Sequence, residues 1–170
     1  MAGRLGFKVF NGPFPTTAAQ APVTTGTAIK TMLQLKPITQ LTVVSWGISF
    51  DASALATPIR CELLTTGTVF ATVTATVEAD ITRFYDGPAN SVTAATYLTL
   101  GTAATGYTST AEGTITATDM IDARFVSPTD GWNYEWSLGR EPVVQAGDCL
   151  RIRVTAAAAV NAYCWVLLET

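Results

Sequence analysis

Few side chains in this sequence are of the types that carry out acid–base or nucleophilic chemistry. The 170 residues include no histidine, which excludes a Ser-His-Asp or Cys-His site because histidine supplies the general base there. Paired carboxylates can hydrolyse glycosides, and the candidates are Asp119 with Asp122 and Asp148 with Glu141. These residues are more simply interpreted as turn or cap residues. We therefore predict no catalytic residue and no enzyme.

Cofactor and metal motifs are not expected either. The segment Gly101–Gly106 lacks the lysine that a phosphate-binding loop requires, and the acidic loop residues have no EF-hand spacing. Cys61, Cys149 and Cys164 have no CxxC spacing, and each lies inside an apolar segment. Such cysteines are typical of small buried side chains in a chain made in a reducing compartment. We predict no cofactor and no bound metal.

One aromatic row has the spacing of a binding surface. Trp132, Tyr134 and Trp136 alternate along one expected strand and therefore point the same way. If the row is exposed, it could stack on the apolar faces of sugar rings. If it is buried, it belongs to the core. The flanking Gly131 and Gly139 frame a strand, which favours the core interpretation.

Composition restricts the partners of this chain. Only 14% of its residues are charged, and its net charge is −3, whereas about 25% are charged in an average soluble domain. Phosphate binding needs clustered Lys and Arg, so we predict no nucleic-acid partner. A neutral surface of threonines such as Thr72 and Thr74 favours contacts with other proteins. The alternative is a monomer that is merely poor in charge.

The sequence predicts neither a membrane partner nor export. No apolar run approaches the roughly 20 residues that a membrane helix needs. Residues 1–10 carry charge but no continuous apolar core, so we expect no signal peptide. The protein is expected to be made in a cytoplasm.

The C-terminal third contains the clearest strands. In 149–155 the apolar residues alternate with Arg151 and Arg153, which predicts a strand with one wet face. The run 162–168 is apolar at successive positions, which predicts a strand covered on both sides. We expect the two strands to form an antiparallel hairpin. The two arginines are either solvated charges or contacts with acidic groups of a partner.

Short strand signals recur from residue 27 onward and predict the fold class. About eight to ten strands with turns between them indicate an all-β antiparallel β-sandwich, jelly-roll-like, over residues 27–170. In 41–50, Trp46 and Ile48 should face one side while Leu41 and Val43 face the other. Residues 78–109 are the least regular part, and we expect an excursion there rather than a second domain.

The first 26 residues are broken by Pro and Gly. We interpret residues 1–26 as an extended N-terminal arm outside the sandwich, with a flexible tail as the alternative. The arm is unusually apolar for a tail. Its expected contacts with a capsid or another subunit are Phe7, Val9, Phe10 and Phe14.

Several segments together resemble a known family. They are Thr27–Leu35 (TAIKTMLQL), Glu62–Thr68 (ELLTTGT), Leu138–Pro142 (LGREP), Ala146–Asp148 (AGD) and Arg151–Val154 (RIRV). In their order they resemble the capsid decoration, or cement, proteins of tailed bacteriophages of actinobacteria, over patches of residues 26–169. The resemblance implies a jelly-roll-like sandwich that binds the major capsid protein on the outer surface of the virion. It also implies a homotrimer that stabilises the shell, made in the host cytoplasm.

A second hypothesis stays open beside this one. A carbohydrate- or receptor-binding module of a tail fibre or adhesin would use the aromatic row of Trp132, Tyr134 and Trp136. The decoration family has no catalytic residues that could be placed on this sequence. A glycosidase, as a third possibility, would need two carboxylates facing one cleft.

Overall fold

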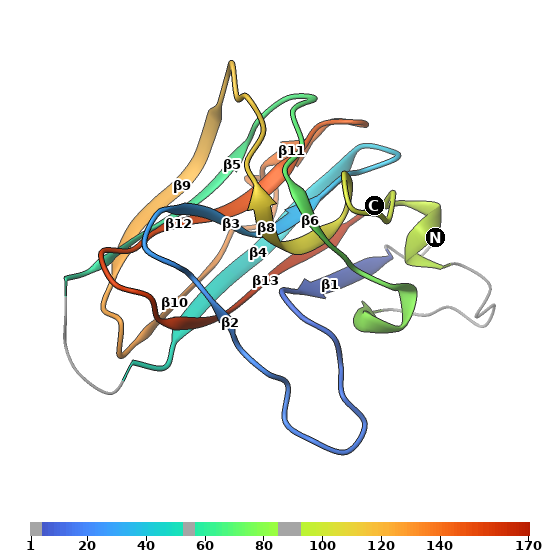
Figure 1. Cartoon of the computed structure of the whole chain (residues 1–170). Coiled ribbons are helices and arrows are strands. Elements are labelled where there is room, and N and C mark those ends of the chain that lie inside the picture. The colour runs from blue at the N-terminus through green and yellow to red at the C-terminus, as the bar shows by residue number, and fades with distance from the viewer. Residues whose placement is uncertain (1–4, 53–56, 85–92) are drawn as a thin grey trace.

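Two antiparallel β-sheets packed face to face form the molecule (Figure 1). The computed structural model describes residues 5–52, 57–84 and 93–170. Sheet A runs in the order β10 (Gly131–Glu135), β4 (Leu41–Phe50), β13 (Asn161–Glu169), β1 (Gly6–Phe10) and β7 (Ile81–Phe84), with β11 (Val143–Val144) beside β4 and β2 (Val23–Thr24) beside β13. Sheet B runs β6 (Thr72–Ala75), β8 (Gly106–Ala111), β3 (Ile29–Leu35), β12 (Leu150–Thr155), β5 (Ile59–Thr65) and β9 (Asp119–Val126). The predicted all-β antiparallel sandwich is confirmed.

The helical content is small. The described residues include two 3₁₀ turns, η1 (Glu78–Asp80) and η2 (Ala94–Thr96). In the described part of the chain, no helix has the length and apolar character needed to cross a membrane.

The core lies between the sheets because most of the long strands turn alternate apolar residues inward. Val9, Trp46, Leu63, Ile152 and Val166 are all buried there. The three cysteines are free and buried, as predicted. Apolar burial of this extent is the main favourable term for folding.

The predicted hairpin of residues 150–168 is wrong. β12 pairs with β3 and β5 in sheet B, whereas β13 pairs with β1 and β4 in sheet A. The connection 156–160 therefore crosses from one sheet to the other. Both strands are central, so neither has a free edge to offer the other. The period-2 pattern identifies a strand, but it does not identify the neighbour with which the strand pairs.

The predicted N-terminal arm is also wrong over its described residues. β1 lies between β13 and β7 as an inner strand of sheet A, and Phe7 and Val9 belong to the buried core. β2 adds to β13 at Asn161 and Ala162, so the boundary at residue 26 does not separate an arm from the sandwich. Residues 1–4 lie outside the described residues. The apolar character that suggested an arm comes from a core strand.

A β-bulge changes the expected faces of β4. Its pairing with β13 shifts between Leu167 and Leu168, where the pairs Ser45–Leu167 and Val43–Leu168 leave Val44 as the extra residue. The extra residue reverses the alternation. Leu41 and Val43 are therefore buried in the same core as Trp46 and Ile48, not on the opposite face as predicted.

The irregular segment 78–109 contributes to both sheets. It supplies the edge strand β7 to sheet A and the start of β8 to sheet B. Residues 85–92 of this segment lie outside the described residues. Leu98 is buried and bridges to Pro37, so the segment is built into the sandwich and is more than the excursion that the sequence predicted.

Candidate interaction surface

The outer face of sheet B carries charged side chains that the chain itself covers. Arg151 has an exposed fraction of 0%. Its guanidinium donates to the carboxylate (3.1 Å) and backbone oxygen (3.0 Å) of Glu112 and to the backbone oxygen of Val69 (2.6 Å). Glu112 also accepts from the Thr31 N–H at 2.6 Å and from the Ser109 hydroxyl. The prediction that Arg151 contacts a partner is wrong, because crossing segments of the same chain satisfy and bury it.

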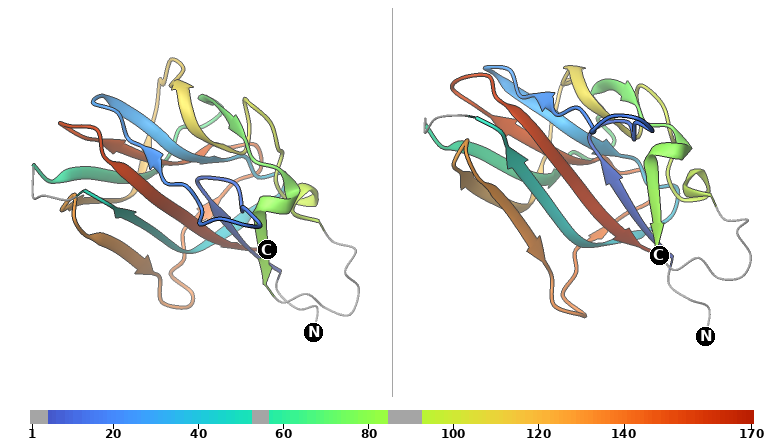
Figure 2. Two further views of the ribbon diagram at one scale, coloured as in Figure 1. Left: turned by 60° about the horizontal axis from the view of Figure 1, so that its bottom comes forward. Right: turned by 90° about the horizontal axis from the view of Figure 1, so that it is seen from below.

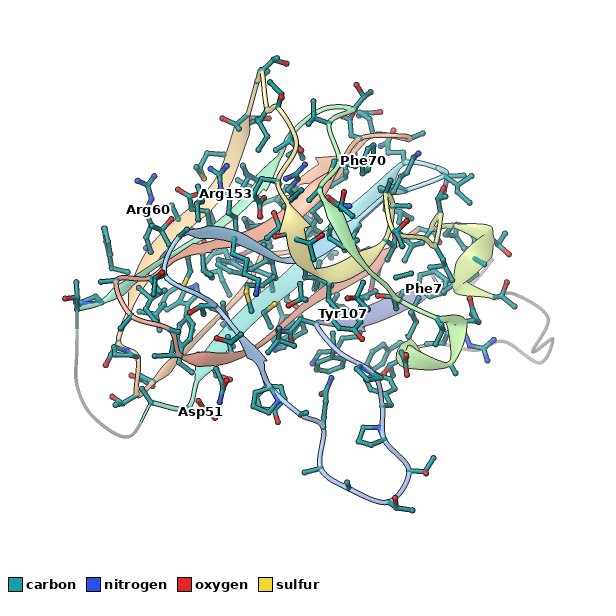
Figure 3. All side chains as sticks on the ribbon, viewed as in Figure 1. Phe7, Asp51, Arg60, Phe70, Tyr107 and Arg153 are labelled. Carbon is teal, nitrogen blue, oxygen red and sulfur yellow. The ribbon has the colours of Figure 1, made fainter. Side chains whose placement is uncertain are left out.

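Arg153 has an internal partner as well. Its guanidinium binds the Glu62 carboxylate at 2.8 Å, and Arg60 binds the other oxygen of the same carboxylate at 2.6 Å. Figure 3 shows the labelled Arg60 and Arg153 close together on the sheet B side. Glu62 is 4% exposed, so this carboxylate is already occupied on both sides. Arg153 is therefore not the free contact that the sequence predicted.

The outer face of sheet A is different, because side chains of aromatic and aliphatic type lie half-buried on it. The loop after β1 contacts part of this face, where the Tyr163 hydroxyl donates to the Gln20 oxygen. The right view of Figure 2 looks toward this sheet. Alternation along β1 and β13 directs one set of residues outward. Together with Phe14 of the loop after β1, we call this set the aromatic face: Lys8, Phe10, Phe14, Tyr163, Trp165 and Leu167, all of intermediate exposure.

Lys8 and Trp165 form the centre of the aromatic face. The Lys8 ammonium lies 3.8 Å from the centroid of the Trp165 ring and 5.1 Å from that of Phe10, which is cation–π geometry. Burial lowers the pKa of the Lys8 ammonium. Among the residues that the structure describes, no carboxylate forms an ion pair with Lys8. A carboxylate brought by a partner therefore finds a partly desolvated cation here.

Gly47 allows the indole of Trp165 to lie flat on the sheet. Gly47 pairs with Trp165 across β4 and β13. A Cβ atom at Gly47 would stand 2.7 Å from two carbons of the indole, far inside van der Waals contact. The absence of a side chain at Gly47 thus fixes the height of the ring above the sheet.

The segment after β1 holds the remaining aromatic residues in place. Asn11 is buried, and its side chain donates to the Ala162 oxygen at 3.0 Å and accepts from the Cys164 N–H at 2.9 Å. The Phe14 N–H donates to Asp80 at 2.8 Å, and the Phe14 ring packs edge-on against Phe10 at 5.5 Å. Two of the four predicted arm contacts, Phe10 and Phe14, therefore meet on the aromatic face, whereas Phe7 and Val9 face the core.

A shallow groove of about 440 Å³ lies beside Trp165, between β13 and the edge strand β10. Its rim includes the side chains of Ser49 and Asn133, and Gly131 leaves room for it. An indole edge, a hydroxyl and an amide thus border one hollow. Such a mixture provides apolar contact and hydrogen-bonding groups in one place.

The aromatic row on β10 is neither fully core nor fully exposed. Trp132 and Trp136 pack against the core, while Tyr134 is 38% exposed. The Trp132 and Tyr134 rings stack with centroids 6.4 Å apart, and Arg124 from β9 lies over Trp132 at 4.7 Å. The row therefore lies at the margin of the core, where the outermost strands of the two sheets face each other.

The predicted carboxylate candidates are engaged in structural contacts where the structure gives them partners. Asp122 accepts a hydrogen bond from the Trp46 indole at 3.2 Å and pairs with Arg124 at 3.2 Å. Within residues 5–52, 57–84 and 93–170, no group of three or more His, Cys, Asp or Glu side chains could hold a metal ion. Comparison with protein-family models, curated proteins and solved structures finds no match to this chain.

Sequence reasoning missed most of the aromatic face. Tyr163, Trp165 and Leu167 were expected to be covered, because 162–168 is apolar on both faces. The available signal was Lys8, which stands between the core residues Phe7 and Val9 and must point away from them. That alternation identifies the outer side of β1. Because Phe10 pairs with Trp165 across β1 and β13, it also identifies the direction in which Trp165 points.

Proposed function

We propose that this protein is a structural capsid decoration protein that binds the outer surface of a phage head through its aromatic face. The observation that carries the proposal is the half-exposed cluster of Phe10, Trp165 and Lys8 on the outer face of sheet A. Tryptophan and tyrosine are enriched where protein–protein binding energy is concentrated. The family resemblance of the sequence supplies the identity of the partner, the major capsid protein.

The mechanism is adhesion without covalent chemistry. Apolar area that the shell covers contributes about 25 cal/mol per Å² before the entropy costs of association. A shell carboxylate over Lys8 would replace the solvent that remains around this cation and would orient the sandwich. The resemblance further implies a homotrimer, in which several aromatic faces bind at once and their affinities combine. Decoration of this kind stabilises the shell because it holds neighbouring capsid subunits together.

The test is binding to empty heads that lack this protein. We expect Trp165→Ala to lower the affinity at least tenfold and Lys8→Ala to lower it severalfold, measured by co-sedimentation. Lys36→Ala is the matched control, because the Lys36 ammonium also lies over an aromatic ring, Phe70 at 4.7 Å. Equal affinity of the Trp165 variant and the wild type would exclude the aromatic face as the docking surface.

The second candidate function is the carbohydrate- or receptor-binding module. It is favoured by the partial exposure of Tyr134 in the stacked row with Trp132. Arg124 already lies over Trp132, which leaves less of that ring for a sugar. Glycan-array binding that is lost in Trp132→Ala and in Trp136→Ala, with the fold intact, would support this function over decoration.

A further inference from the structure

Two unpaired strand edges lie on the same side of the sandwich. β9 is the last strand of sheet B and pairs only with β5, and β10 is the last strand on its side of sheet A and pairs only with β4, as far as the described residues show. The two strands lie one above the other, since Arg124 of β9 covers Trp132 of β10 (Figure 1). We call this the open side. A free β-strand edge presents backbone groups that another strand can pair with. On β9 the Ala123 N–H donates to the Asp122 carboxylate at 2.9 Å, so pairing there exchanges this local hydrogen bond for one to the partner strand.

Exposed apolar side chains gather on the open side. They come from β9, from β10 and from the chain that continues to β11 along the same edge of β4. These residues are Met120 (42% exposed), Phe125 (75%), Tyr134 (38%), Leu138 (82%) and Val143 (43%). Of the other large apolar residues with high exposure, Ile29, Ile38, Val77 and Phe84, none belongs to β9, β10 or β11. Exposed apolar side chains on adjoining elements favour an interaction surface on this side of the molecule.

The charges of β9 restrict which strand can pair with it. Asp122 and Arg124 pair with Leu63 and Cys61 of β5, whose side chains belong to the core, so both point into the space between the sheets. Inward-pointing charges on an edge strand discourage pairing with an arbitrary strand, because they meet no complementary charge there. Asp122 and Arg124 already form an ion pair with each other at 3.2 Å within the chain. A suitable partner strand must therefore extend this pair with charges of alternating sign, a positive group opposite Asp122 and a negative group opposite Arg124.

A second copy of β9 meets this requirement. Directly opposite residues of antiparallel strands point to the same face. When two copies run antiparallel about a two-fold axis at Ala123, Asp122 of each copy lies opposite Arg124 of the other. Cross-strand pairs of opposite charge stabilise such a contact. A shift of the register by two residues in one direction places Asp122 opposite the Asp122 of the other copy. The same shift in the other direction places Arg124 opposite Arg124. Both shifts bring like charges together, so the register centred on Ala123 is the favoured one.

We propose that two copies of this chain associate through their β9 edges, antiparallel and centred on Ala123, into one continuous sheet. Phe125 of each copy then extends along the strand of the other. Because β10 lies beneath β9, the same two-fold axis also relates the aromatic rows on β10 of the two copies. The two rows then face each other across the contact. The proposal does not rest on capsid binding, and its two-fold symmetry differs from the trimer that the sequence resemblance implies.

The test uses the full chain and multi-angle light scattering at concentrations from about 1 to 100 μM. The wild type should reach twice the chain mass of 17.9 kDa. Ala123→Lys and Ala123→Glu, which each place like charges opposite one another at the axis, should remain at the mass of one chain. An equimolar mixture of the two variants should return to the double mass, because residue 123 meets its own counterpart only in this register.

Three results would overturn the proposal. They are a wild type that stays at one chain mass over the whole range, a wild type at three chain masses, and Ala123 variants that keep the double mass. Circular dichroism and thermal unfolding establish that each variant is folded. Phe125→Lys is a second variant on the exposed side of β9 and should raise the dissociation constant at least tenfold. Trp165→Ala should dimerise normally, so a failure of the capsid proposal leaves this one intact.

Discussion

The outer faces of the two sheets differ in what covers them. On sheet B, Arg151 is completely buried, and the segments that carry Val69 and Glu112 close over it. On sheet A, Lys8 lies over Trp165 at the surface with no ion pair to a described carboxylate. The Arg151 network on sheet B is thus internal, whereas the aromatic face of sheet A is half-exposed. In this fold, polarity alone does not tell which face of a sheet is exposed.

The largest effect is expected from breaking the covered face. Glu112→Ala removes the carboxylate that pairs with Arg151 at 3.1 Å. A buried charge left without its partner costs about 3–5 kcal/mol, and the partial exposure of Glu112 places our expectation at the lower end, about 3 kcal/mol. The free energy of unfolding from urea titration measures it. A loss below about 1 kcal/mol would show that the network on sheet B does not hold the covering segments.

A smaller effect is expected from Gly47→Ala on the aromatic face. The new methyl group would stand 2.7 Å from the Trp165 indole, so the ring must move. Overpacking costs about 1–3 kcal/mol in a tight core, and less here because the indole can move toward solvent. We expect a destabilisation of about 1 kcal/mol, a changed tryptophan emission and at least tenfold weaker binding to heads. Ser49→Ala, on the same face, is the control and should change neither emission nor stability.

The smallest effect on stability is expected from Lys8→Met. A cation–π contact at an exposed site is worth about 0.5–1 kcal/mol, and the variant keeps an unbranched side chain. Arg151→Met should cost several times more in urea titrations, since Glu112 and Val69 then lose their donor. Equal costs for the two variants would remove the distinction between the faces.

The pH dependence of Lys8 sharpens the same comparison. Its pKa is lowered from 10.5 by burial, so near this pH the unfolded chain holds more protons than the folded one. Stability of the wild type relative to Lys8→Met should therefore rise as the pH increases toward 10.5. A fall over this window would indicate that Lys8 is stabilised as a cation in the folded protein.

The sequence predicts the elements of this fold better than their neighbours. Alternation in 149–155 identifies β12, and the long apolar run 41–50 identifies β4 as a central strand. The exposure expected for the C-terminal strands is reversed, however. β12, expected to have a wet face, is covered on both sides, whereas β13, expected to be covered, has a half-exposed outer face.

The physical reason is that coverage of a sheet face depends on segments distant in sequence. Arg151 is buried by Val69 and Glu112, which lie 82 and 39 residues away along the chain. No local pattern around Arg151 encodes this contact. The bulge at Val44 is a second example, since it reverses the faces of β4 through its pairing with β13. Local alternation therefore predicts the strands, but only the tertiary structure determines which side meets solvent.

Electron microscopy of heads decorated with this protein tests the central claim most directly. At a resolution that separates the two sheets, our account predicts that the outer face of sheet A lies against the shell, with density from the shell over Trp165 and Lys8. The segments of Val69 and Glu112 on sheet B should then point toward solvent. A density in which sheet B faces the shell and Trp165 stays in solvent would contradict the account.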